Sequence, residues 1–278
     1  MSSLTAIDQA EATVNLLGGL VLEDGRRLDR VGLRRLSGRE EDWLARHDGV
    51  SNAEAITEML AACMTQEDPF LSTRQVARQL LVGDRAYVMI QLRRLTLGDQ
   101  IAAVYVCPAC ASKMDVSLDL ADAPVEFSPQ LRSIYELQLA GDRIVRFRLP
   151  TGADQESVAT LPVDDAVDAL LHRCIVESGE RPLNDDDRQR ISDEMERVAP
   201  GVEIELDLSC PECGHQFLVE FDVAAFFFAE LAASHKTLLR EVHHLAFHYG
   251  WSEAAILAMD RGRRRTYLSL LADELRQE

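Results

Sequence analysis

The sequence predicts an α+β protein in which two similar units of β-hairpins and helices are followed by an α-helical tail. Three observations support this prediction. The tetrapeptides Cys107-Pro-Ala-Cys110 and Cys210-Pro-Glu-Cys213 recur 103 residues apart, each between two strand-like segments. Further residues match at the same offset. The last part of the chain differs from both units, because its apolar residues recur at helical spacing.

Alternating apolar and polar residues flank both cysteine pairs. The first pair lies between residues 101–106 and 114–120, and the second lies between residues 204–209 and 217–223. Such alternation is typical of half-buried strands, so each pair is expected at the turn of a β-hairpin. Two such turns facing one another supply four thiolates, which is the ligand set of a closed structural zinc site. The pattern is similar to a zinc ribbon.

We interpret the pairs as two halves of one shared site, with one structural zinc ion per chain bound by Cys107, Cys110, Cys210 and Cys213. The alternatives are two independent sites, a thioredoxin-like redox pair, or cysteines that are only buried. Two independent sites would need further ligands, and only His215 lies near a pair, whereas the first pair has Ser112 at that place. A closed site of four cysteines leaves no position for a catalytic water.

The repeat extends beyond the cysteines. At the same offset Asp84-Arg85 matches Asp187-Arg188, and with small gaps Gly38 matches Gly152 and Cys63 matches Cys174. The two matched cysteines lie in apolar helical patterns and are expected to be buried thiols, not ligands. The sequence thus predicts a tandem duplication: an N-terminal segment 1–19, a first copy 20–122, a second copy 123–225 and a helical tail 226–278.

Composition narrows the range of functions. The 278 residues include 47 acidic and 29 basic ones, for a net charge of −18, so binding to nucleic acid or anionic lipid is not expected. With 47% apolar residues the chain can bury a core, yet no stretch suits a membrane helix and residues 1–19 do not read as a secretory signal. No Gly-rich phosphate loop or Gly-x-Ser-x-Gly motif occurs. We therefore expect a non-enzymatic protein, without catalytic residues or small-molecule substrate, in the cytoplasm of the producing cell.

The tail is predicted to contain three helices. Asp222 can cap a long helix to Tyr249, ended by Gly250, and Ser252 can cap a short one before a last helix that carries Tyr267. His244 and His248 could instead hold a catalytic metal, although the order His-Glu-x-x-His is absent. The basic cluster of this helix is expected to form ion pairs within the chain or with a partner, and not to contact nucleic acid; it consists of Arg261, Arg263, Arg264 and Arg265. Phe226 is expected either to pack on the cysteine hairpins or to face a partner protein.

Four stretches together resemble a family of baseplate proteins from contractile-tailed bacteriophages and related contractile injection systems. They are LLVGDRAYVMIQLRRLTLGD leading into CPAC, LPTGADQE, CPEC, and EVHHLAFHYGWSEAAILAMDRGRRRTYLSLL. The resemblance implies a structural or assembly role in the baseplate hub or its junction with the tail tube. Its implied partners are other baseplate, hub or tail-tube proteins, bound through the C-terminal helices. Ala111 departs from the family pattern, which has Gly after the second Cys of the pair.

Two other functions remain as alternatives. One is a zinc-ribbon regulator that binds nucleic acid, which would need a basic face with aromatic residues for stacking. The segments around both cysteine pairs lack such a face. The other is a metallohydrolase built on the C-terminal histidines, which would also need a carboxylate and an open metal position.

Overall fold

The computed structural model describes residues 11–22, 24–47, 49–65, 71–125, 132–141, 143–179 and 181–276. Its first unit begins with an antiparallel sheet of β1 (Ala12–Val21), β2 (Arg27–Leu33) and β3 (Met64–Thr65). Four helices accompany this sheet: α1 (Gly38–Arg46), α2 (Asn52–Cys63), α3 (Thr73–Gln79) and α4 (Val82–Leu97). The mixture of helices and small antiparallel sheets confirms the α+β class.

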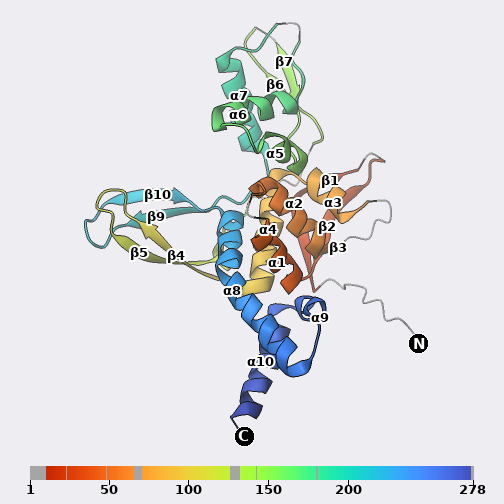
Figure 1. Ribbon diagram of the computed structural model, residues 1–278. Coiled ribbons are helices and arrows are strands. Elements are labelled where there is room, and N and C mark those ends of the chain that lie inside the picture. The colour runs from red at the N-terminus through yellow and green to blue at the C-terminus, as the bar shows by residue number, and fades with distance from the viewer. Residues whose placement is uncertain are drawn as a thin grey trace.

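The second unit follows a closely similar order. Its antiparallel sheet consists of β6 (Tyr135–Gln138), β7 (Ile144–Phe147) and β8 (Ile175–Glu177). Its helices are α5 (Gly152–Val158), α6 (Val163–Cys174) and α7 (Asp185–Val198), and α3 has no counterpart among the described residues. In Figure 1 this unit lies above the first and is joined to it near α4 and α5.

Local sequence explains why α1 and α5 begin where they do. Both start with a capping box, in which the side chains of Ser37 and Thr151 each pair with an acidic residue three positions on. Each acidic residue also binds an arginine that leaves the preceding strand: Arg34 pairs with Glu40, and Arg148 pairs with Asp154. The matched Ser-Gly and Thr-Gly segments therefore have the same local structure in both units.

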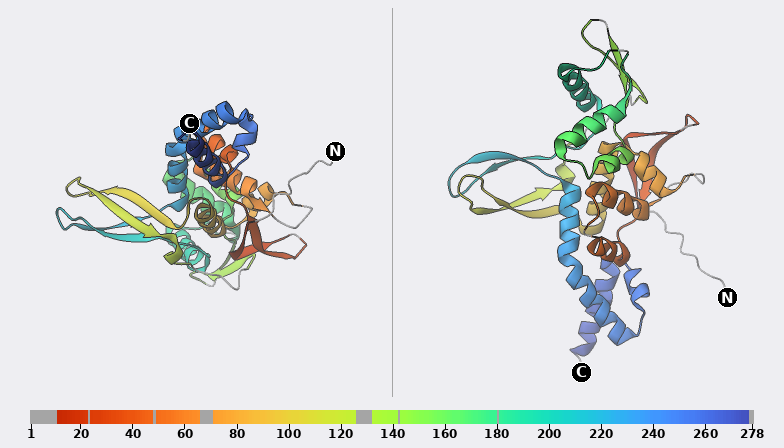
Figure 2. Two further views of the ribbon diagram at one scale, coloured as in Figure 1. Left: turned by 90° about the horizontal axis from the view of Figure 1, so that it is seen from below. Right: turned by 45° about the horizontal axis from the view of Figure 1, so that its top comes forward.

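Four strands form an arm that projects away from the helices (Figures 1 and 2). The arm consists of two hairpins, β4 (Gln100–Val106) with β5 (Lys113–Asp119) and β9 (Glu205–Ser209) with β10 (Gln216–Glu220). A 3-10 turn, η1 (Leu120–Asp122), follows the first hairpin. The hairpins form separate sheets and meet through side chains, because Met114 and Leu208 belong to one buried cluster. The strands expected around both cysteine pairs are confirmed.

The tail contains α8 (Val223–Tyr249), α9 (Glu253–Leu257) and α10 (Arg261–Leu275). Asp222, Ser252 and Asp260 cap these helices through side-chain hydrogen bonds, and Gly250 ends α8 in the left-handed conformation with φ of 66°. The first turns of α8 share the core of the first unit, so the tail is packed on that unit along much of its length. Within the described ranges no helix is both long and apolar enough to span a bilayer.

The two capped glycine segments dock in the same way on the starts of other helices. The Gly38 amide donates to the Met259 carbonyl just before α10, and the Gly152 amide donates to the Leu80 carbonyl just before α4. A side chain at either glycine would collide with a buried arginine, Arg264 or Arg85 respectively. The close approach of other atoms therefore favours glycine at both positions. The second unit packs on α4 of the first unit in the same way that the first unit packs on α10 of the tail.

Candidate metal centre

Four cysteine sulfur atoms converge at the tip of the arm. The Sγ atoms of Cys107, Cys110, Cys210 and Cys213 all lie within 4.8 Å of one another. Cys107 Sγ is 3.7 Å from Cys213 Sγ, and Cys110 Sγ is 3.6 Å from Cys210 Sγ. These close pairs join one hairpin to the other, and their separations far exceed the roughly 2.0 Å of a disulfide bond. The two sequence repeats thus meet at a single cluster that could hold a metal ion.

Both cysteine turns use the same backbone hydrogen bonds. The Cys107 amide donates to the Ser112 carbonyl and the Cys210 amide to the His215 carbonyl, each at 2.9 Å. The residue after the second cysteine donates back to the first: Ala111 to Cys107, and Gly214 to Cys210. That residue is left-handed in both turns, with φ of 59° at Ala111 and 71° at Gly214. Ala111 therefore keeps the turn geometry at a steric cost that glycine avoids.

The thiols differ in how readily they ionise. Hydrogen bonds involving Ser112 lower the pKa of Cys110 to about 6. A backbone hydrogen bond at His215 acts to lower the pKa of Cys213, but the neighbouring Cys110, partial loss of solvent, Cys210 and Cys107 outweigh it and raise that pKa to about 12. Ionisation of one thiol in the cluster therefore disfavours ionisation of its neighbours. A cation among the four sulfur atoms would remove this opposition, which is how thiolate sites are held together.

The surroundings of the cluster favour a structural site over an open one. Cys107 and Cys210 are 1% and 2% exposed, and the side chains of Met114 and Leu208 pack beside them. Cys110 and Cys213 are exposed at the tip. Four ligands from two turns fill a tetrahedral coordination sphere, so the arrangement can join two hairpins but offers no position for substrate.

The other two cysteines are core residues. Cys63 and Cys174 are both 0% exposed at the C-terminal ends of α2 and α6. Burial raises the pKa of Cys174 to about 11, which keeps it a neutral thiol. The expectation that these two cysteines are buried thiols is confirmed by their position.

The C-terminal histidines do not assemble into a second metal site within the described residues, where the four cysteines are the one group of at least three potential ligands within reach of each other. His244 and His248 are exposed on α8. His235 is bound instead to Asp42, with Nε2 3.1 Å from Oδ1. The metallohydrolase alternative therefore loses the ligand cluster that it needs.

Two of the four arginines at the start of α10 make ion pairs within the chain, which is one of the two roles expected of this segment. Arg264 is 0% exposed and donates from Nη2 to Glu41 and from Nε to Glu241, each at 2.8 Å. Arg261 also reaches Glu41, at 2.8 Å. These pairs fix α10 to α1 and α8. They leave only the outer arginines of this segment for contacts with another molecule.

Phe226 packs within the chain. Its ring lies 5.2 Å from the ring of Phe221, in the cluster at the base of the arm that also contains Ile90, Ile101 and Ile204. Of the two alternatives for this residue, the structure supports packing next to the cysteine hairpins. The side chain is half-buried there, so a contact of Phe226 with a partner protein stays a prediction.

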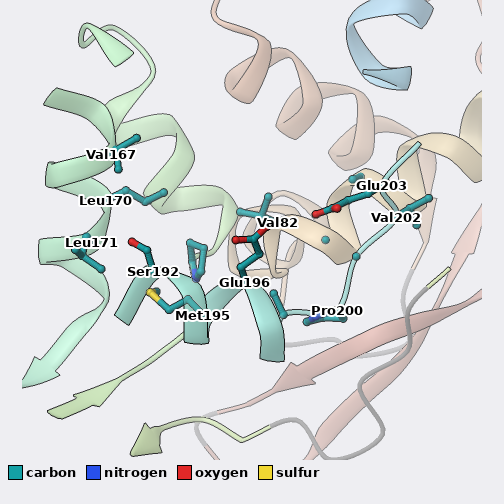
Figure 3. Close-up of a pocket in the computed structure, with 15 residues that line it drawn as sticks. Val82, Val167, Leu170, Leu171, Ser192, Met195, Glu196, Pro200, Val202 and Glu203 are labelled. Carbon is teal, nitrogen blue, oxygen red and sulfur yellow. The ribbon is translucent and has the colours of Figure 1, made fainter. Parts of the chain in front are cut away.

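A groove that sequence reasoning missed lies between α6, α7 and the start of α4 (Figure 3). Its volume is about 390 Å³, and Val167, Leu170, Met195 and Val82 supply apolar walls. The sequence offered one indication of it, because Val163, Val167 and Leu170 form an apolar row at helical spacing along α6. In the structure Val163 and Val167 of this row are 78% and 56% exposed. An exposed apolar row of this kind is uncommon on a helix that has no partner.

Comparison with known proteins identified one family. The family described as "T4 bacteriophage base plate protein" matches residues 28–229, which include the first unit from β2 onward, the second unit, the arm and the first turns of α8. Searches of curated proteins and of solved structures found no match. The baseplate resemblance expected from the sequence is confirmed.

Proposed function

Because the chain belongs to the T4 bacteriophage base plate protein family, we propose that it is a non-enzymatic structural or assembly component of the baseplate of a phage-like contractile tail or injection system. The observation that carries this proposal is the family match over most of the chain. A closed four-cysteine cluster and the lack of a second ligand cluster among the described residues are consistent with a structural role. Within this proposal the protein acts in the cytoplasm of the producing bacterium and in the particle that forms there.

The metal proposed for the cysteine cluster is one zinc ion per chain. A tetrahedral site with Zn–S bonds of about 2.3 Å has its sulfur atoms about 3.8 Å apart. The two inter-hairpin separations of 3.7 and 3.6 Å agree with that value. Iron can take the same four thiolates, so the geometry alone does not select between the two metals. Elemental analysis of protein purified under reducing conditions should give one zinc per chain and no iron.

We further propose that the zinc staples two copies of a duplicated unit. Support comes from the recurring strand and helix order, the paired capping boxes and the two equivalent glycine contacts. The proposed units are those of the sequence, residues 20–122 and 123–225. In the structure β1 begins at Ala12, so the first hairpin extends N-terminal to that boundary.

The proposed partners are other baseplate, hub or tail-tube proteins, contacted through the C-terminal helices. Exposed apolar side chains remain on those helices after the internal pairs have formed. Phe247 on α8 is 76% exposed, and Leu270 and Leu275 on α10 are 52% and 53% exposed. Surface side chains of this kind are candidates for a protein interface.

Complementation tests the proposal. In a producing strain that lacks the gene, the wild-type protein should restore particles with baseplates, counted by electron microscopy. Cys110→Ser and Cys213→Ser should fail equally, because either change removes one ligand of the same tetrahedron. Glu212→Ala, a change of an exposed residue between two of the ligands, is the matched control and should restore particles. Particles at wild-type number with either cysteine variant would contradict the structural role of the metal.

The alternative is a zinc-ribbon regulator that binds nucleic acid. The arm does not favour it, since residues 100–120 contain a single lysine and no arginine, and residues 204–220 contain neither. Non-specific binding to nucleic acid depends on such cations. Fluorescence anisotropy with labelled DNA and RNA should show no binding at physiological salt. A salt-sensitive micromolar affinity would support the regulator instead.

A further inference from the structure

The groove between α6, α7 and α4 corresponds to a place in the first unit that is filled by α8. By the sequence match, Ile56, Met59 and Leu60 of α2 correspond to Val167, Leu170 and Leu171 of α6. Helix α4 matches α7 at an offset of 103 residues, so Met89 corresponds to Ser192 and Arg93 corresponds to Glu196. All five of these second-unit residues line the groove.

In the first unit the corresponding residues are covered. Met59 and Met89 are 1% and 0% exposed, in a core that also contains Phe227, Phe228 and Leu231 of α8. Arg93 forms an ion pair with Glu230 of α8 at 3.0 Å. The two methionines and this ion pair therefore place α8 directly over the face formed by α2 and α4.

The third wall of the groove also has a counterpart. Gly152 of the second unit packs at the start of α4, and Gly38 of the first unit packs in the same way at the start of α10. In this respect α4 is to the second unit what α10 is to the first, so the two helices occupy equivalent positions. Arg261 at the start of α10 binds Ser234 of α8 at 2.8 Å. In the second unit Val82 at the start of α4 lines the groove instead. Figure 3 shows Val82 opposite Leu170 and Met195 across this space.

The second unit has no helix of its own to place there among the described residues. The arm hairpin of the second unit leads into α8, whereas the hairpin of the first unit leads only into the 3-10 turn η1. The single long helix covers the first unit. Leu170 is consequently half-buried, and Val167 is 56% exposed, although both stand at positions that are more buried in α2.

We propose that this groove binds an amphipathic helix of a partner protein in the baseplate, in the place that α8 takes on the first unit. The helix would carry large apolar residues spaced like Phe227, Phe228 and Leu231. At the position of Glu230 it would carry lysine or arginine, because Glu196 replaces Arg93 and so reverses the charge. Glu196 and Glu203 on the rim have no ion pair with any described residue. Binding of an amphipathic helix in an apolar groove is a common recognition mode.

The lining favours a helix over a small molecule. Binding pockets for small ligands converge several polar groups on the ligand. Here the polar side chains are those of Ser192, Glu196 and Glu203, and the two glutamates are exposed at the edge. The proposal rests on the assembly role given above, but it concerns a surface apart from both the cysteine cluster and the C-terminal helices.

Binding can be tested with the full chain and two helical peptides held by a lactam bridge on their outer face. One has the sequence of residues 223–236, and the other carries Glu230→Lys. The lysine peptide should bind with micromolar affinity by isothermal titration calorimetry, about threefold to fivefold tighter than the glutamate peptide. Glu196→Arg in the protein should reverse that preference, and Leu170→Arg should abolish binding. Glu274→Arg, an equal change of charge at an exposed residue of α10, should leave the preference unchanged.

Three results would overturn the proposal. One is that neither bridged peptide binds, and another is that Leu170→Arg leaves peptide binding intact. The third is that sedimentation shows a dimer of the wild-type chain that Leu170→Arg dissociates, because a second copy would then occupy the groove. In the complemented strain Leu170→Arg should reduce the number of particles while Glu212→Ala, the control used above, does not, and normal assembly with Leu170→Arg would also overturn the proposal. Failure of the wild-type gene to restore particles would instead contradict the baseplate role itself.

Discussion

The ion pairs of Arg264 provide a quantitative test of how the tail is attached. Arg264→Ala removes two charge-assisted hydrogen bonds to carboxylates and one to the Met259 carbonyl. It leaves Glu241, whose side chain is 10% exposed, without its partner, whereas Glu41 keeps Arg261. Removing one member of a buried ion pair costs about 3–5 kcal/mol. Because one of the two glutamates remains paired, we expect a loss of about 3 kcal/mol in the free energy of unfolding.

Urea denaturation followed by tryptophan fluorescence is a suitable assay. The chain has two tryptophans: Trp43 lies on α1, which α10 contacts through Glu41, and Trp251 lies between α8 and α9 and packs against Tyr267 of α10. Arg265→Ala removes an exposed arginine from the adjacent position and should change stability by less than about 0.5 kcal/mol. The double variant of Arg261 and Arg264 should lose more than the sum of the single losses, because both bind Glu41. A loss of stability for Arg264→Ala no larger than that for Arg265→Ala would refute this reasoning.

Three further predictions concern the turns, the pH dependence and the metal. Gly214→Ala should weaken metal affinity about fivefold in a chelator competition, and Ala111→Gly should strengthen it by a similar factor, because both positions are left-handed; equal affinities would contradict this. Burial acts to raise the pKa of Asp154, but hydrogen bonds from Arg148 and Thr151 hold it well below its ordinary value of 3.8. Its contribution to stability is therefore present above about pH 4 and lost as the pH falls further, so Asp154→Asn should flatten the decline of the unfolding free energy below pH 4; an unchanged decline would count against it. Removing the metal should raise hydrogen exchange in residues 100–119 and 205–220 while the helical units stay protected; a uniform rise would show that the arm does not open alone.

Sequence reasoning succeeded where local chemistry determines structure. The strands around Cys107 and Cys210, the caps at Asp222 and Ser252 and the end of α8 at Gly250 all depend on residues near in sequence. The convergence of the four cysteines is a long-range feature, yet the sequence indicated it because the two halves share one pattern. A repeated motif thus made a tertiary contact visible in the sequence.

The features that the sequence did not indicate depend on which faces meet. Phe226 was open to two interpretations, and its packing on Phe221 depends on how α8 meets the base of the arm. Ion pairs were expected for the basic segment that contains Arg264, but the sequence did not indicate that its partners would be Glu41 of α1 and Glu241 of α8. The apolar spacing along α6 is the spacing of any buried helix face, so it does not show whether another element of the chain covers that face. For this reason the groove was not predicted.

If the two units are copies of one ancestor, as proposed, the helix that follows the second copy leaves the two copies in different states. One helix, α8, follows the second unit and packs on the first, so its apolar face is used there. The substitutions in the second unit agree with a surface that binds something other than α8. Ser192 stands in the place of a fully buried methionine, and Glu196 would repel Glu230 where Arg93 attracts it. A face that had only lost its covering helix would be expected to gain polar residues throughout, but Val167 and Leu170 remain apolar at the positions of Ile56 and Met59, although Val167 is 56% exposed. Retained apolar residues together with a reversed charge are what a surface for a different helix requires.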